Sequence, residues 1–151
     1  AKRYAEALTL AYHRQQGVNT CIFNTYGARR RRNDGHAIPT LLHQAIEGEP
    51  LTVFGDGSQT RSFCYVDDLV LGLNLLAQSE EHLPLNLGNP REMTLLELAE
   101  TVIRVTGSNS EIVFAALPMD DPHVRQPEIT RARQVLRDAT ALPDALEAIS
   151  R

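Results

Sequence analysis

The sequence lacks any surplus of positive charge and any long apolar run. Its formal net charge is −4, and the basic run from Arg29 to Arg32 is local and has no interleaved aromatic residues. Nucleic acid and anionic membrane surfaces are therefore not expected as partners. No apolar stretch is long enough to span a bilayer and no signal peptide is present, so we expect a cytoplasmic protein without a membrane segment.

Cysteine pairs, metal-type histidine spacing and a glycine fingerprint are absent as well. Cys21 and Cys64 lie far apart without C-x-x-C spacing, which predicts reduced, buried thiols. The five histidines show no paired spacing, so no metal is expected. There is no G-x-G-x-x-G, which an α/β dinucleotide binder normally carries after its first strand. The chain opens at Ala1 inside a helical pattern, and we expect it to be a piece of something longer.

The remaining pattern is that of an α/β protein. The 151 residues are 42% apolar and 23% charged, enough for one ordinary domain with a core. Helices and short strands alternate, which favours an α/β fold. Helices are predicted over 1–16, 39–48, 67–77, 94–106, 129–136 and 143–150. Strands are predicted over 18–23, 51–54, 60–66, 85–88 and 111–116, and loops over 24–36 and 117–127.

Local end signals support three of these helices. Gly48 and Gly107 stand where a helix would stop in a left-handed residue. Thr94 and Glu97 have the spacing of a capping box. Asp67 is a candidate N-cap for the helix that follows the 60–66 strand.

The central stretch runs from Gly48 to Leu69. Gly55-Asp56-Gly57-Ser58 predicts a tight turn between two short strands, with glycine freedom at two positions. Arg61 follows the turn, and its guanidinium can grip a phosphate with two parallel hydrogen bonds. The residues alone leave two interpretations open: a clamp for a phosphorylated small molecule, or a β-hairpin whose arginine is merely solvated.

Several motifs together resemble one family. They are Lys2-Arg3-x-Ala5-Glu6, Phe23-Asn24-Thr25-Tyr26-Gly27-x-Arg29, Gly55 to Arg61 with Tyr65-Val66-Asp67-Asp68, Asn86-Leu87-Gly88-Asn89-Pro90, and Asp120-Asp121-Pro122 with Arg125-x-Pro127. This pattern resembles the C-terminal half of the extended short-chain dehydrogenases/reductases that act on nucleotide sugars. Within that family it is most similar to the UDP-glucuronate decarboxylase (UDP-xylose synthase) branch, up to about Leu136.

The resemblance implies an organisation for the chain. Residues 1–50 would end a Rossmann-type parallel sheet that binds NAD. Residues 51–136 would form mainly a small α/β subdomain for the nucleotide sugar, interleaved with the sheet, and residues 137–151 an atypical tail. A homodimer through the helix at residues 1–16 is also implied.

The implied reaction converts UDP-glucuronate to UDP-xylose and CO₂ through a 4-keto intermediate, with NAD as the cofactor. The alternatives are an NAD-dependent 4-epimerase or 4,6-dehydratase, and a non-catalytic remnant that at most binds a UDP-sugar. Because the dinucleotide fingerprint is missing, we expect the 151-residue chain by itself to be inactive and to bind NAD poorly.

On the cofactor side the resemblance assigns three residues. Lys2 matches the lysine of a Tyr-x-x-x-Lys pair, which holds the nicotinamide ribose and lowers the tyrosine pKa, so it is the one catalytic candidate here. Thr25 and Arg29 match positions near the nicotinamide.

On the substrate side, Asn24 matches a residue near the sugar. Arg61 and Arg125 match arginines that neutralise the UDP pyrophosphate. Thr52 and Val53 would offer backbone groups to the uracil.

Two positions near the implied site depart from the family pattern. Ala28 stands where the family has proline, and His36 stands where it carries an arginine close to the reacting sugar. Histidine lacks the guanidinium fork and is cationic only near or below its pKa, so the substrate contact expected at His36 is altered.

Overall fold

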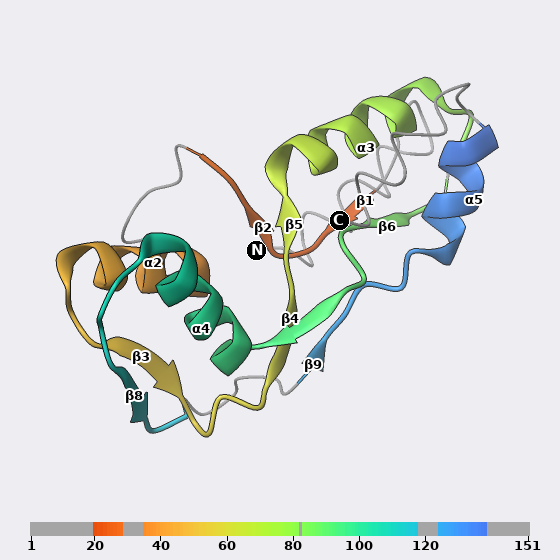
Figure 1. Ribbon diagram of the computed structural model, residues 1–151. Coiled ribbons are helices and arrows are strands. Elements are labelled where there is room, and N and C mark those ends of the chain that lie inside the picture. Colours follow the sequence, from red (N-terminus) through yellow and green to blue (C-terminus); the bar gives the residue numbers. More distant parts are fainter. Residues whose placement is uncertain (1–19, 29–34, 82, 118–123, 139–151) are drawn as a thin grey trace. The chain divides into compact units, whose positions relative to one another are not determined.

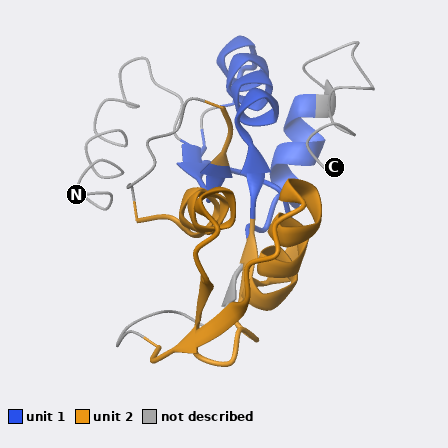
Figure 2. Cartoon of the chain, turned by 60° about the vertical axis from the view of Figure 1, so that its left-hand side comes forward, with its two compact units in different colours: residues 1–25, 63–91, 127–151 blue, residues 26–62, 92–126 orange. Residues whose placement is uncertain are grey.

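The computed structural model describes residues 20–28, 35–81, 83–117 and 124–138 (Figure 1). The chain forms two compact units, each built from separate segments (Figure 2). The first unit comprises residues 1–25, 63–91 and 127–151, and the second comprises residues 26–62 and 92–126.

The sequence analysis divided the chain at residues 50 and 136 into an NAD-binding part, a nucleotide-sugar-binding part and a tail. This division by ligand stays a prediction. The compact units follow other boundaries, because each is closed by segments that are distant in sequence. The helices expected over 1–16, with their dimer contact, and over 143–150 lie outside the described residues.

The first unit is a small parallel pair of strands covered by helices. Its elements are β1 (Thr20–Ile22), the first residue of β2 (Thr25–Tyr26), β5 (Cys64–Tyr65), α3 (Val66–Gln78), β6 (Leu85–Leu87) and α5 (Thr130–Asp138). β1 runs parallel to β6 with Thr20 opposite Leu85, and α3 and α5 both contact β6. The core consists of Cys64, Leu69, Leu75, Leu76, Leu85, Leu87, Ile129, Ala132 and Leu136.

Helix α3 is helical because its leucines recur on one face. Leu69, Leu75 and Leu76 are buried on that face. The helix begins one residue before the predicted N-cap: Tyr65 is the N-cap, without a side-chain bond, and Asp67 lies in the first turn. The prediction of Asp67 as N-cap was therefore wrong. The strand β5 runs directly into the helix, and the Asp67 carboxylate instead faces the positive end of the helix dipole.

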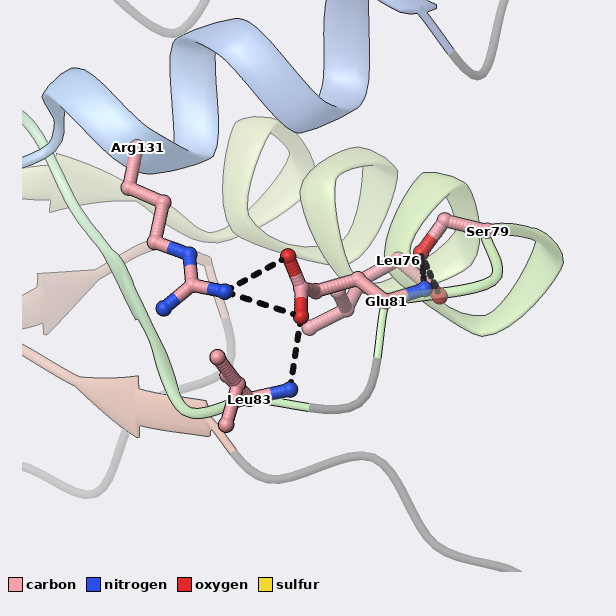
Figure 3. A network of polar contacts seen from close by, with 5 residues as sticks. All are labelled: Leu76, Ser79, Glu81, Leu83 and Arg131. Carbon is pink, nitrogen blue, oxygen red and sulfur yellow. Dashed lines mark hydrogen bonds and ion pairs between the residues drawn. The ribbon is translucent and has the colours of Figure 1, made fainter.

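A polar network joins the end of α3 to α5 (Figure 3). Arg131 Nη2 donates to both carboxylate oxygens of Glu81 at 3.1 and 3.0 Å, and the Leu83 N–H donates to the same carboxylate at 2.6 Å. Ser79 closes the helix end by donating to the Leu76 carbonyl at 2.8 Å. The ion pair is partly exposed, so we assign it only about 0–1 kcal/mol.

In its described residues the second unit holds two small sheets and two helices. Its elements are the end of β2, α2 (Ala37–Glu47), β3 (Leu51–Phe54), β4 (Thr60–Ser62), β7 (Glu92–Thr94), α4 (Leu95–Thr106), β8 (Ile112–Ala115) and β9 (Val124–Arg125). β3 pairs in parallel with β8. β4 lies between β7, which is antiparallel to it, and β9, which is parallel. α2 and α4 contact each other and β3, burying Leu41, Ala45, Leu51, Val53, Leu98, Ala99 and Val102.

The predicted helix ends of this unit are confirmed. Gly48 and Gly107 are left-handed C-caps with φ 72° and 66°. Thr94 Oγ1 accepts from the Glu97 N–H at 3.1 Å, and Glu97 Oε2 accepts from the Thr94 N–H at 2.7 Å, which completes the capping box.

The short strands were the least accurate part of the sequence prediction. β2 lies inside the predicted loop 24–36, β9 lies inside the predicted loop 117–127, and β7 was not predicted. Strands of two or three residues carry no readable alternation, because period 2 needs several residues to show. The α/β fold with parallel strands is nevertheless confirmed. No helix among the described residues has the length and apolarity needed to cross a bilayer.

Candidate functional site

The turn between β3 and β4 is closed by its own side chains. Asp56 Oδ1 accepts from the Ser58 N–H at 3.0 Å and from the Ser58 hydroxyl at 2.6 Å. Gly55 and Gly57 have φ values of 64° and 76°, which side-chain-bearing residues rarely adopt. The predicted glycine-dependent turn is therefore confirmed.

The same turn is fastened to the start of α4. The Leu96 N–H donates to the Gly57 carbonyl at 3.2 Å, and the Leu95 N–H donates to the Gln59 carbonyl at 3.2 Å. These two N–H groups lie in the first turn of α4, where no intrahelical acceptor exists. The carbonyl groups of the turn thus accept hydrogen bonds from N–H groups at the start of α4, and the same bonds fix the turn to the helix.

Arg61 lies on β4, two residues beyond Gln59, and it is buried. Its side chain is 7% exposed, and Nη1 donates to the Thr60 carbonyl at 2.7 Å. The Thr60 hydroxyl donates to Glu92 Oε1 on β7 at 2.6 Å. A buried guanidinium is tolerated only where acceptors or anions surround it, so the interpretation of Arg61 as a merely solvated hairpin residue is wrong.

The three-stranded sheet brings Arg125 beside Arg61. The parallel pairing of β4 with β9 makes the two residues register partners, and Met93 of β7 lies on the other side of Arg61. Neighbouring strands lie about 4.8 Å apart in the hydrogen-bonding direction. Because Arg61 is buried and a second arginine is its register partner, this row of the sheet is a candidate anion site in the described residues.

Thr52 and Val53 lie on β3, before the turn. Gln44 of α2 engages Thr52 twice: its Oε1 accepts from the Thr52 N–H at 3.0 Å, and its Nε2 donates to the Thr52 hydroxyl at 3.1 Å. Val53 is 2% exposed. The Thr52 N–H is therefore already committed to Gln44.

Asn24 and Thr25 belong to the first unit, whereas the other five described candidates belong to the second. The Asn24 carbonyl accepts from the Cys64 N–H at 2.8 Å, and the Thr25 hydroxyl donates to the Phe23 carbonyl at 2.8 Å. Both side chains are half-buried. Their position is thus set by pairing with the start of β5.

The Asn-Leu-Gly-Asn-Pro motif, residues 86–90, packs against Phe23, the residue before Asn24. A Cβ on Gly88 would lie 3.2 Å from Phe23 Cβ and 3.2 Å from Pro127 Cγ, so only glycine fits without a shift. Asn89 Nδ2 donates to the Phe63 carbonyl at 3.1 Å. The sequence analysis used this motif only as evidence for the resemblance. It missed the structural roles of Asn89 and Gln59, two buried polar residues whose side chains form hydrogen bonds.

His36 is the N-cap residue of α2. Its carbonyl accepts from the Thr40 N–H at 3.2 Å and from the Thr40 hydroxyl at 2.9 Å, and its side chain makes no cap bond and is exposed. Lys2 and Arg29 lie outside the described residues. The register of β4 and β9 makes Arg61 and Arg125 neighbours, and the substrate and cofactor assignments of all these residues stay predictions.

The buried thiol of Cys64, in the first unit, does not have the properties of a nucleophile. Burial, with the Asp68 carboxylate nearby, raises the pKa of Cys64 from 9.0 to about 11. Burial and the neighbouring Asp67 also raise the pKa of the Asp68 carboxyl. A thiol is reactive as its thiolate, so Cys64 is inert near neutral pH. No group of three potential ligands for a metal ion occurs in the described part of the chain.

Comparisons with known proteins agree on one family. A family model described as the NAD dependent epimerase/dehydratase family matches residues 1–88, more than half of the chain. UDP-glucuronic acid decarboxylase 4 of Arabidopsis thaliana is 49% identical over 138 residues, which make up 89% of this chain and 31% of that protein. UDP-glucuronic acid decarboxylase 1 of Danio rerio is 46% identical over 138 residues, 89% of this chain and 33% of that protein.

A solved structure shows the same arrangement of elements. The UDP-glucuronic acid 4-epimerase from Bacillus cereus, in complex with UDP-glucuronic acid and NAD, matches with a TM-score of 0.80 at 28% identity. The match covers 98% of this chain and 49% of that one. The chain thus spans about a third of the length of the two decarboxylases and about half of the epimerase chain.

Proposed function

Because this chain belongs to the NAD-dependent epimerase/dehydratase family, we propose that it is the C-terminal part of a UDP-glucuronate decarboxylase. In this proposal the second unit holds the UDP of the substrate, and the full-length protein converts UDP-glucuronate to UDP-xylose and CO₂. Identities of 46–49% with the two decarboxylases over 89% of the chain support the branch.

The observation that carries the proposal is the register of β4 and β9. It makes Arg61 and Arg125 neighbours on one sheet. Burying the charge of Arg61 costs free energy unless a partner compensates it, and a bound anion would do so. A pyrophosphate carries the charge that two guanidinium groups can neutralise with parallel hydrogen bonds. The arrangement therefore fits a diphosphate better than a neutral ligand.

The nucleobase would lie by β3, next to this anion site. Since Gln44 already accepts from the Thr52 N–H, Thr52 would have to serve the uracil through its carbonyl, and Val53 through its own backbone groups. Asn24 of the first unit is retained as the proposed contact to the sugar. His36, whose side chain is exposed, is retained as the proposed substitute for the family's arginine.

The described residues hold only one of the three cofactor candidates. Of the three candidates for the cofactor, only Thr25 is described, and its hydroxyl donates to Phe23. In the full-length protein, NAD would supply the oxidation and reduction of the sugar ring.

The first experiment identifies the product. The full-length protein is incubated with UDP-glucuronate and NAD, and the mixture is analysed for CO₂ and UDP-xylose. Formation of UDP-galacturonate without CO₂ would instead assign the 4-epimerase activity, which the likeness to the Bacillus cereus enzyme favours. No conversion together with no UDP binding would contradict both.

The second experiment tests the anion site. Arg61→Ala should weaken UDP binding by about 1.5–3 kcal/mol, the usual worth of a hydrogen bond to a charged group, measured by calorimetry. Arg104→Ala is the matched control, because Arg104 lies exposed on α4 of the same unit. Circular dichroism spectra of both variants check folding. Equal UDP affinity in Arg61→Ala and the control would remove Arg61 from the site.

A further inference from the structure

We propose that Gln59 is a positioning residue that sets the spacing between the end of β3 and the start of β4. Under the proposed function, on which this inference rests, these two strands serve the nucleobase and the pyrophosphate of UDP. Gln59 would then set the distance between the nucleobase side of the site on β3 and the pyrophosphate side on β4 without touching the ligand.

The side chain of Gln59 crosses the turn. It is 4% exposed, and its Nε2 donates to the carbonyl of Phe54, the last residue of β3, at 2.7 Å. The acceptor of this bond therefore lies one residue after Val53, and Val53 is one of the residues proposed to bind the base. Asp56 and Ser58 bond to each other at the tip of the turn.

The backbone of Gln59 is held on the opposite side. Its carbonyl accepts from the Leu95 N–H at 3.2 Å, at the N-terminus of α4. The next residue, Thr60, begins β4 and donates to Glu92 at 2.6 Å. Gln59 is thus anchored to β3 through its side chain and to α4 through its main chain, two residues before Arg61.

The donor group of Gln59 is what links the two strands. Without it, the Phe54 carbonyl would face a buried side chain that offers no hydrogen bond, which favours a shift of the turn away from β3. Such a shift moves Arg61 relative to Val53, while it leaves each half intact. A ligand that spans both halves should then lose affinity, and a ligand that uses one half should not.

This difference separates positioning from simple stabilisation. UDP would contact both halves, uridine only the β3 side, and inorganic pyrophosphate only the arginine side. A variant that merely loosens the fold would weaken all three ligands in parallel. A variant that changes the spacing would weaken UDP selectively.

The test uses Gln59→Met, which is similar in length but has no N–H donor. Dissociation constants are measured in the full-length protein, by calorimetry for UDP and by NMR titration for uridine and pyrophosphate. We expect Kd for UDP to rise about fivefold, the equivalent of one ordinary hydrogen bond, and Kd for the two smaller ligands to stay within about twofold. Gln78→Met, an exposed glutamine at the end of α3, should change none of them.

Gln59→Glu gives a second, pH-dependent readout and serves if Gln59→Met does not fold. Its carboxylate cannot donate to the Phe54 carbonyl, whereas its protonated form can. The ratio of variant to wild-type Kd for UDP should therefore fall toward one as the pH is lowered. A ratio that does not change with pH, or parallel weakening of UDP, uridine and pyrophosphate, would overturn the inference.

The two proposals fail in different ways. If the wild type binds UDP and Arg61→Ala weakens it, but the Gln59 variants do not, only the positioning inference is lost. If the wild type binds no UDP, the proposed function is lost and the inference with it.

Discussion

Replacing Gly57 by alanine tests how the turn between β3 and β4 is held. Gly57 has φ +76°, and a Cβ there would lie 3.0 Å from Val53 Cγ1 and 3.1 Å from Leu96 Cβ. Val53 is 2% exposed, and Leu96 belongs to the first turn of α4, whose N–H bonds to the Gly57 carbonyl. Neither neighbour can give way without disturbing the packing around it.

The expected loss has two parts. A left-handed conformation costs a residue with a Cβ about 1–2 kcal/mol. Overpacking against neighbours that cannot move typically costs about 1–3 kcal/mol more. Alanine also restricts the unfolded chain, which offsets about 0.4–1 kcal/mol. We therefore expect Gly57→Ala to lower the free energy of unfolding by about 1–4 kcal/mol.

Gly107→Ala is the matched control. Gly107 has φ +66°, and a Cβ there would meet nothing within 4 Å. The conformational cost and the unfolded-state offset are therefore nearly the same, and the packing cost is absent. The difference between the two variants, about 1–3 kcal/mol, isolates the contact with Val53 and Leu96.

Urea unfolding followed by far-ultraviolet circular dichroism measures both variants, since the chain contains no tryptophan to report by fluorescence. The midpoints and slopes of the transitions give the free energies of unfolding. Equal losses for Gly57→Ala and Gly107→Ala would refute the close approach, and with it the tight fastening of the turn to α4.

Two further predictions concern the capping box and the buried thiol. Thr94→Ala should lower the free energy of unfolding by about 1 kcal/mol, because it removes the acceptor for the Glu97 N–H; Thr94→Ser should retain most of it, and equal losses in the same urea titration would contradict the capping role. Cys64, whose pKa is raised from 9.0 to about 11 by burial and by Asp68, stays neutral in the folded state while the unfolded thiol ionises. The free energy of unfolding should therefore be unaffected below about pH 8 and should fall as the pH rises from 9 toward 11. Cys64→Ala should lose this dependence, and a wild-type profile identical to that of Cys64→Ala would show that the thiol does not titrate in this way.

Most of the fold could be predicted from the sequence. The strand over 51–54 has the predicted bounds, and the helix from Leu95 to Thr106 begins and ends at the predicted caps. The helix α2 begins at Ala37, two residues before the predicted start at Pro39, since a proline is tolerated within the first turn. The signals for these elements are local in the sequence.

The candidate site could be predicted only in part. The resemblance indicated Arg61 and Arg125 as anion ligands, and the structure adds that they are register partners. The structure also shows that the Thr52 N–H donates to Gln44, so this N–H is not available to the uracil. The positions of Lys2 and Arg29 lie outside the described residues and stay predictions.

The sequence by itself determined where the chain turns and where its helices stop. Glycine at Gly48 and Gly107 and the Thr94–Glu97 pair act within one or two turns of chain, so their effect does not depend on distant partners.

Only the tertiary structure decided which strands pair. β9 is two residues long and lies in a proline-rich stretch, and it is a strand because β4 offers it a free edge. Pairing of short strands depends on backbone groups from distant segments, and residue types do not encode the partner. The register that sets Arg61 opposite Arg125, and the bond from Gln59 to the Phe54 carbonyl, were decided at that level.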